Sequence, residues 1–133
     1  LTIHLALSER TRGLIGTAEL ARMKPTAYLV NTARGPIVDE SALVNALKRR
    51  VIAGAAVDVF EREPLPLDHP FRELDNILLT PHIGYVTEET YRIYFPDVIE
   101  NIQAHLEDKP IRLLNAPLKA KVDSGHASSS GAL

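Results

Sequence analysis

The chain has 133 residues, of which 45% are hydrophobic and 24% are charged, with a formal net charge of −2 and no cysteine. The small net charge gives no basic field for nucleic acid, and the lack of cysteine excludes disulfides, thiolate metal sites and a cysteine nucleophile. No apolar run approaches membrane-spanning length. We therefore expect one globular domain in a reducing compartment, the cytoplasm, with no metal at its site and no membrane partner.

The first predicted elements are a strand and a short helix. Residues 1–5 are apolar and β-rich, which predicts a buried strand ending near His4. A polar turn over 8–13 follows, and then a helix over 18–23 with Thr17 as its N-cap. Because the chain starts inside such a strand and not at a methionine, we expect it to be a piece of a longer protein.

The stretch Asn31-Thr32-Ala33-Arg34-Gly35-Pro36-Ile37-Val38-Asp39 lies between a predicted strand over 27–30 and a predicted helix over 40–50. Asp39 is the predicted N-cap of that helix. Arg34 therefore sits where a parallel strand ends, and in open α/β sheets this edge binds ligands. Its planar guanidinium suits a carboxylate or a phosphate.

The third predicted strand, over 53–60, is small and apolar, as expected for a strand covered on both faces. Its end carries Asp58. The proline-rich segment 61–70, which holds Glu63, is too irregular for a helix or a central strand. A helical turn is predicted over 71–74.

A fourth strand is predicted over 77–80, and His82 follows its end. The next pattern predicts a helix over 87–106, with a kink or a break into two helices at Pro96. From residue 116 the composition is that of a linker, so we expect a disordered tail over 116–133.

The order β-α-β-α-β-loop-β-α predicts a parallel sheet with helices on its faces and right-handed crossovers. Polar residues that follow successive strands then gather at one edge of the sheet. These residues are His4, Arg34, Asp58, Glu63 and His82. Taken singly, Arg34 is usually a solvated loop residue and His82 most often a hydrogen-bonded loop histidine. His4 is more often structural, Glu63 could be a surface charge, and Asp58 could be a turn cap.

The other histidines and the basic run show no comparable pattern. His69, His105 and His126 lack metal-ligand spacing and are predicted to be solvated. The run Lys48-Arg49-Arg50 fits the last turn of a helix, where the dipole favours cations, better than it fits a phosphate site.

Three stretches resemble the D-isomer-specific 2-hydroxyacid dehydrogenases, the family of D-lactate, glycerate, formate and phosphoglycerate dehydrogenases. They are residues 23–35 (MKPTAYLVNTARG), 55–66 (AAVDVFEREPLP) and 79–84 (LTPHIG). Three motifs in the family's order make the resemblance specific, and it extends over residues 1–115.

The resemblance implies an α/β fold, the second half of a Rossmann-like doubly wound parallel sheet that is incomplete without a missing N-terminal part. Residues 1–85 would be the C-terminal half of the dinucleotide-binding domain. Residues 86–115 would be the crossover helix and the return toward the substrate domain, and 116–133 the tail.

The resemblance also implies a role for each matched position. Arg34 would bind the substrate carboxylate, His82 would exchange a proton with the 2-oxygen, and Glu63 would pair with His82. The cofactor would be bound by Thr32, Ala33, Asp58 and Gly84. These roles suit the chemistry of the reaction. A histidine can exchange the proton because its ordinary pKa lies near the working pH, and the cofactor supplies the hydride.

The implied activity is hydride transfer between NAD or NADP, with NAD favoured, and a small 2-hydroxy or 2-keto acid. The sequence has no Gly-x-Gly-x-x-Gly turn, so we expect the missing N-terminal half of the protein to hold the phosphates and these residues alone to be inactive. A homodimer of the parent protein is also implied. Two alternatives stay open: a non-catalytic dinucleotide-sensing module, and a structural fragment whose exposed sheet edge pairs with another copy.

Overall fold

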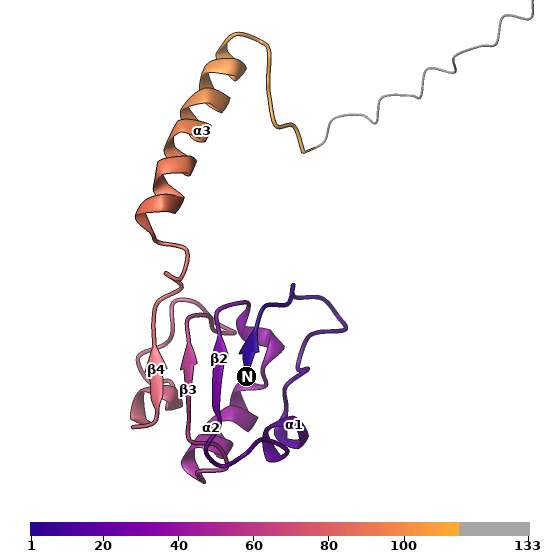
Figure 1. Ribbon diagram of the computed structural model, residues 1–133, viewed down its shortest axis with the longest axis vertical. Helices are drawn as coiled ribbons and strands as arrows, with labels where there is room; N and C mark the ends of the chain where they lie inside the picture. Colours follow the sequence, from indigo (N-terminus) through magenta and orange to yellow (C-terminus); the bar gives the residue numbers. More distant parts are fainter. Residues whose placement is uncertain (115–133) are drawn as a thin grey trace, which may run out of the picture. The chain divides into compact units, whose positions relative to one another are not determined.

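The computed structural model describes residues 1–114, and Figure 1 shows how their helices and strands are arranged. The elements are β1 (Thr2–Ile3), α1 (Thr17–Ala21), β2 (Tyr28–Asn31), the 3₁₀ helix η1 (Gly35–Ile37), α2 (Glu40–Lys48), β3 (Gly54–Val57), the 3₁₀ helix η2 (Pro70–Glu73), β4 (Ile77–Leu79) and α3 (Glu88–Leu106). The chain divides into two compact units, Leu1–Tyr91 and Arg92–Leu133. The tail predicted over 116–133 lies outside the described residues.

The strands form one parallel sheet in the order β1-β2-β3-β4 (Figure 1). One row of paired residues crosses the whole sheet: Thr2, Val30, Ala56 and Leu78. Because the strands are parallel, their carboxyl ends lie at the same edge. The predicted α/β class with a parallel sheet is confirmed.

Helices α1 and α2, together with η2, form the hydrophobic core with one face of the sheet. Leu29 of β2 and Val57 of β3 are buried there. They meet Leu43 and Leu47 of α2 and Phe71 of η2, all of which are also buried. The buried positions of α2 recur at helical spacing, so the apolar stripe of this helix faces the sheet.

The opposite face of the sheet is left open by the rest of the first unit. Tyr28 and Leu78, which point to this face, are 64% and 63% exposed. The expectation that the strand over 53–60 is covered on both faces therefore holds for one face only. Since strand order follows chain order, right-handed crossovers place both helices of this unit on the same side.

The predicted helix starts are right in one case and shifted in the other. Asp39 caps α2, because its Oδ1 accepts the amide hydrogen of Ala42 at 2.9 Å. The N-cap of α1 is Gly16 and not Thr17. The reason is that the Gly16 amide donates to the Glu19 carboxylate at 3.0 Å, so the acceptor comes from the first turn of the helix.

α3 continues without interruption through Pro96, so of the predicted kink or break into two helices the break is wrong. Proline removes one backbone donor, and the turns before and after it stay helical here. Three apolar residues spaced along this helix, Ile99, Ile102 and Leu106, are exposed. None of the described helices is both long enough and apolar enough to cross a membrane.

Candidate active site

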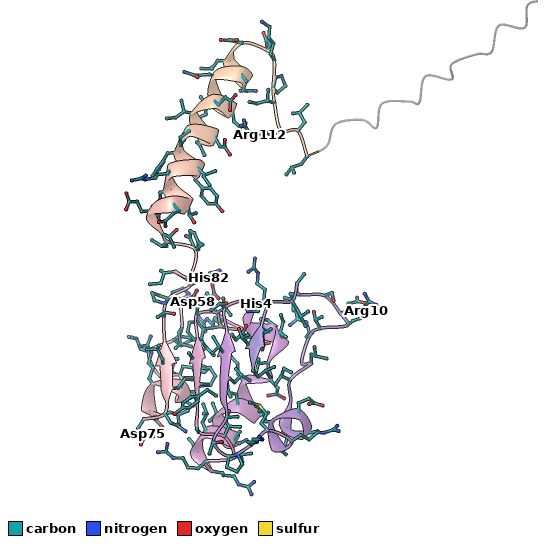
Figure 2. The ribbon with its side chains drawn as sticks, viewed as in Figure 1. His4, Arg10, Asp58, Asp75, His82 and Arg112 are labelled. Atoms are coloured by element: carbon teal, nitrogen blue, oxygen red, sulfur yellow. The ribbon has the colours of Figure 1, made fainter. Side chains whose placement is uncertain are left out.

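Polar side chains from separate turns of the chain lie at the edge where the strands end. Figure 2 shows His4, Asp58 and His82 at this edge, which is the upper edge of the sheet in the view, and Asp75 at the opposite edge. All of these residues belong to the first unit. His4 is exposed, and its Nε2 lies 2.8 Å from the hydroxyl of Thr2.

Asn31 shapes the loop that follows β2. It is 1% exposed, its Oδ1 accepts from the amide of Ala33 at 3.1 Å, and its Nδ2 donates to the carbonyl of Arg34 at 3.0 Å. These bonds hold the Asn31 side chain against Ala33 and Arg34, the residues predicted to contact the cofactor and the substrate. No role was predicted for Asn31, although an asparagine at a strand end is a known turn signal.

The Arg34 side chain is exposed at this turn. Its Nη1 donates to the carbonyl of Ala33 at 2.6 Å. Its positive charge also contributes to lowering the pKa of Glu63, so the guanidinium acts on the carboxylate that pairs with His82. A guanidinium presents five donors in a plane, which suits a carboxylate ligand.

His82 and Glu63 come from the segments after β4 and β3, and the structure brings their side chains together. The Nδ1 of His82 donates to Oε2 of Glu63 at 2.7 Å. Because an ionised carboxylate only accepts, Nδ1 carries the hydrogen and Nε2 is the ring nitrogen left for a substrate. The two side chains are 38% and 35% exposed, so a ligand can reach them.

The pKa of Glu63 lies below its ordinary value of 4.5, chiefly because of the hydrogen bond from His82. Partial burial acts in the opposite direction and raises this pKa. The amide of Phe60, 2.9 Å from Oε1, and the charges of His82 and Arg34 lower it further. Glu63 is therefore ionised at neutral pH and keeps an acceptor fixed beside the imidazole.

Asp58 fixes the backbone around His82, which has a φ of 57° in the left-handed region that non-glycine residues rarely adopt. Oδ1 of Asp58 accepts from the hydroxyl of Thr80 at 2.6 Å and the amide of Ile83 at 2.9 Å. Oδ2 accepts from the amide of Gly84 at 2.8 Å. Burial raises the pKa of Asp58, but these bonds and the charge of His82 together hold it below 3.8.

Two of the predicted cofactor-binding residues therefore contact each other. Asp58 is 5% exposed and bonds to the chain itself. A Cβ at Gly84 would lie only 3.0 Å from Oδ2 of Asp58, so glycine permits this close approach. Their contacts with a cofactor stay predictions.

A cleft of about 520 Å³ lies at the ends of β1 and β2. It is lined by His4, Leu5, Ala6, Leu7, Thr32, Ala33 and Arg34. Four aliphatic side chains and three polar ones form this lining, and such a mixed surface suits a flat ring bearing an amide, such as nicotinamide. The sequence holds no glycine-rich turn for the phosphates, so the fit concerns the nicotinamide end of a dinucleotide.

A second histidine–carboxylate pair lies outside the predicted site. His69, predicted to be solvated, has a side chain only 18% exposed, and its Nε2 lies 3.2 Å from Oε2 of Glu40. The two residues are 29 positions apart, which is why no local pattern revealed the pair. His105 is exposed, and His126 lies outside the described residues. Within residues 1–114, no group of three or more His, Cys, Asp or Glu side chains is arranged to hold a metal.

The fold and this edge define a nucleotide-binding α/β domain, and comparison with known sequences identifies its family. Residues 1–84 match the family described as D-isomer specific 2-hydroxyacid dehydrogenase, NAD binding domain. The chain belongs to this family, which confirms the resemblance drawn from its three motifs.

The glyoxylate reductase of Thermofilum pendens is 49% identical over 115 residues, which is 86% of this chain and 34% of the relative. The glyoxylate/hydroxypyruvate reductase B of Enterobacter agglomerans is 48% identical over 109 residues, 82% of this chain and 34% of the relative. A solved structure of the D-isomer specific 2-hydroxyacid dehydrogenase from Xanthobacter autotrophicus Py2 in complex with NADPH and MES superimposes with a TM-score of 0.65 at 40% identity. The superposition covers 84% of this chain and 45% of the chain in that structure. The chain thus spans about a third of the length of these curated relatives.

Proposed function

We propose that this chain is the portion of an NAD(P)-dependent D-2-hydroxyacid dehydrogenase that carries the catalytic residues, with NAD as the favoured cofactor. The complete protein would interconvert a small 2-keto acid and the corresponding 2-hydroxy acid. The observation that carries the proposal is the 2.7 Å bond between His82 and Glu63 at the strand edge that also carries Arg34. Residues 1–85 would form the C-terminal half of the dinucleotide-binding domain, and 86–115 would return toward the substrate domain.

The proposed roles follow from the needs of the reaction. Reduction of a 2-keto acid adds a hydride to C2 and a proton to the carbonyl oxygen. The bound dinucleotide supplies the hydride. The Nε2 of protonated His82 would give the proton, which is a general-acid contribution of about 10²–10⁴ in rate, while Glu63 keeps the ring in place through Nδ1.

Arg34 would hold the substrate carboxylate, because its fork can bind both carboxylate oxygens at once. Such binding would orient C2 toward the hydride and the carbonyl oxygen toward His82. Thr32, Ala33, Asp58 and Gly84 would position the nicotinamide end, either directly or by shaping the cleft around it. A homodimer and a further N-terminal part are proposed for the complete protein.

The test is a spectrophotometric assay of the complete protein with NADH and with NADPH. Glyoxylate and hydroxypyruvate are the first substrates to try, because the similar proteins are named reductases of these acids. We expect oxidation of the reduced dinucleotide, and loss of most of kcat/KM in Arg34→Ala. Nucleotide binding without turnover of any 2-keto acid would instead support the non-catalytic module.

The 133 residues by themselves are proposed to have no turnover. The sequence lacks the glycine-rich phosphate turn, so a dinucleotide would be held at one end only. NADH-linked reduction by the purified chain would overturn this part of the proposal and leave the rest intact.

A further inference from the structure

The loop that carries Glu63 lies directly against the loop that carries Arg34. Gly35 is buried at this contact. A Cβ at this position would overlap the carbonyl group of Phe60 and the amide nitrogen of Glu61. Because these are backbone atoms on both sides, no side-chain rotation could make room. Glycine is therefore required by the approach of the two chains.

Glu40, in the first turn of α2, makes a second contact with the Glu63 loop. Its Oε1 accepts the amide hydrogen of Glu61 at 2.7 Å, and its Oε2 accepts from Nε2 of His69 at 3.2 Å. The amide of Phe71 donates to Nδ1 of His69 at 3.2 Å, which leaves the hydrogen on Nε2. One carboxylate thus binds the Glu63 loop and the start of η2 to the first turn of α2.

These two contacts act on the Phe60–Glu61 peptide, which directly follows the peptide whose N–H binds Glu63. The amide of Phe60 donates to Oε1 of Glu63, whose Oε2 accepts from His82. A shift of the peptide between Phe60 and Glu61 would therefore move Glu63, and with it the orientation of the imidazole. Arg34 directly precedes Gly35, so the same contact sets the position of the Arg34 backbone relative to this pair.

We infer that Gly35 and Glu40 are positioning residues, which fix Arg34 and the Glu63–His82 pair in one geometry. The inference rests on the proposed function for its catalytic consequence, but the positioning itself can be measured without turnover. His69 contributes less to this positioning, because its removal leaves the hydrogen bond from the Glu61 amide to Glu40 in place.

The test uses variants of the complete protein. Gly35→Ala inserts a methyl group into the contact, and Glu40→Ala removes both bonds of the carboxylate. Glu40→Gln retains an oxygen for the Glu61 amide, and His69→Ala spares that bond. Matched controls are Gly16→Ala, where a Cβ meets no atom closer than 3.5 Å, and Glu9→Ala in the exposed turn before α1.

The first readout is the pKa of Glu63, measured by carbon NMR of the labelled carboxylate in folded protein. We expect it to rise toward 4.5 in Gly35→Ala and Glu40→Ala, because the bonds from Phe60 and His82 loosen. Neither control should change it. A simple loss of global stability would not change the pKa in the molecules that remain folded.

The second readout is steady-state kinetics. We expect kcat/KM for the 2-keto acid to fall by about 10²-fold in Gly35→Ala and about tenfold in Glu40→Ala, with partial rescue in Glu40→Gln and a smaller loss in His69→Ala. The KM for the dinucleotide should stay within about twofold.

Unchanged Glu63 titration in a folded Glu40→Ala protein would overturn the inference, whatever happens to Gly35→Ala. If Gly35→Ala does not fold, the glutamate series alone decides. If the wild-type protein reduces no 2-keto acid, the proposed function fails, and the pKa readout still decides whether the two residues position Glu63.

Discussion

The carboxylate of Asp58 fixes the position of His82, because it accepts hydrogen bonds from residues on both sides of the histidine. These donors are the Thr80 hydroxyl before it and the amides of Ile83 and Gly84 after it. The end of β3 thereby holds the turn that follows β4. The histidine reaches the edge of the sheet through this anchor, and its ring then meets Glu63 from the loop after β3.

Asp58→Ala should therefore destabilise the fold and impair the site together. The substitution removes the acceptor of three partly buried hydrogen bonds, at a cost of about 2–4 kcal/mol in the free energy of unfolding. Urea denaturation measures this loss, and Asp68→Ala in the exposed proline-rich loop is the control. A change below about 0.5 kcal/mol for Asp58→Ala would show that the anchor is not needed.

The Glu63 carboxylate should contribute to stability in a pH-dependent manner. Its pKa in the folded protein is lower than 4.5, so the unfolded chain binds its proton more readily than the folded one. The stabilisation is therefore complete above the unfolded pKa, and it is lost as the pH falls through the folded pKa. The measurement is the difference in unfolding free energy between wild type and Glu63→Gln from pH 7 to pH 3. A difference that grows as the pH falls below 4.5 would contradict a lowered pKa for Glu63 in the folded protein.

Arg34→Lys should separate the charge of this residue from its geometry. Lysine keeps the positive charge but lacks the planar fork, so bidentate binding of a carboxylate is lost. We expect kcat/KM for a 2-keto acid to fall by about 10²-fold in the complete protein, with a higher KM. Arg10→Lys is the matched control, because Arg10 lies in an exposed turn at the side of the sheet, well apart from Asp58 and His82 (Figure 2). Equal activity of the two variants would remove Arg34 from the proposed site.

The open sheet face should make the isolated 133-residue chain associate with itself. Leu78 and Tyr28 expose apolar area there, and such patches favour contact between molecules. Leu78→Lys should shift sedimentation profiles toward the monomer. Leu67→Lys should not, since Leu67 is 89% exposed but lies in a loop. A wild-type chain that is monomeric at all concentrations would contradict this prediction.

Local patterns in the sequence predict the features that depend on neighbouring residues. The Asp39 cap and the placement of the strands are of this kind, because a cap needs only an acceptor within one helical turn. The predicted N-cap of α1, Thr17, lies one residue too late, because the pattern favours a cap residue with a side-chain acceptor. The acceptor for the Gly16 amide comes instead from a glutamate in the first turn of α1. Parallel strands followed by polar residues also predict which residues gather at the edge.

Contacts between distant loops were not predictable in the same way. Glu40 pairs with His69 across 29 positions, and neither residue differs locally from an ordinary surface residue. Gly35 resembles an ordinary turn glycine until the structure shows Phe60 against it. The open face was missed because a small apolar strand such as Gly54–Val57 has the same composition whether one or both of its faces are covered.

The left-handed backbone at His82 has a consequence for engineering. A bulky ring is kept where glycine or asparagine would be accommodated more easily. A library of variants screened for heat resistance alone should drift away from histidine at this position and discard the proposed proton donor. Screening for turnover and screening for thermal tolerance would thus select different residues at position 82.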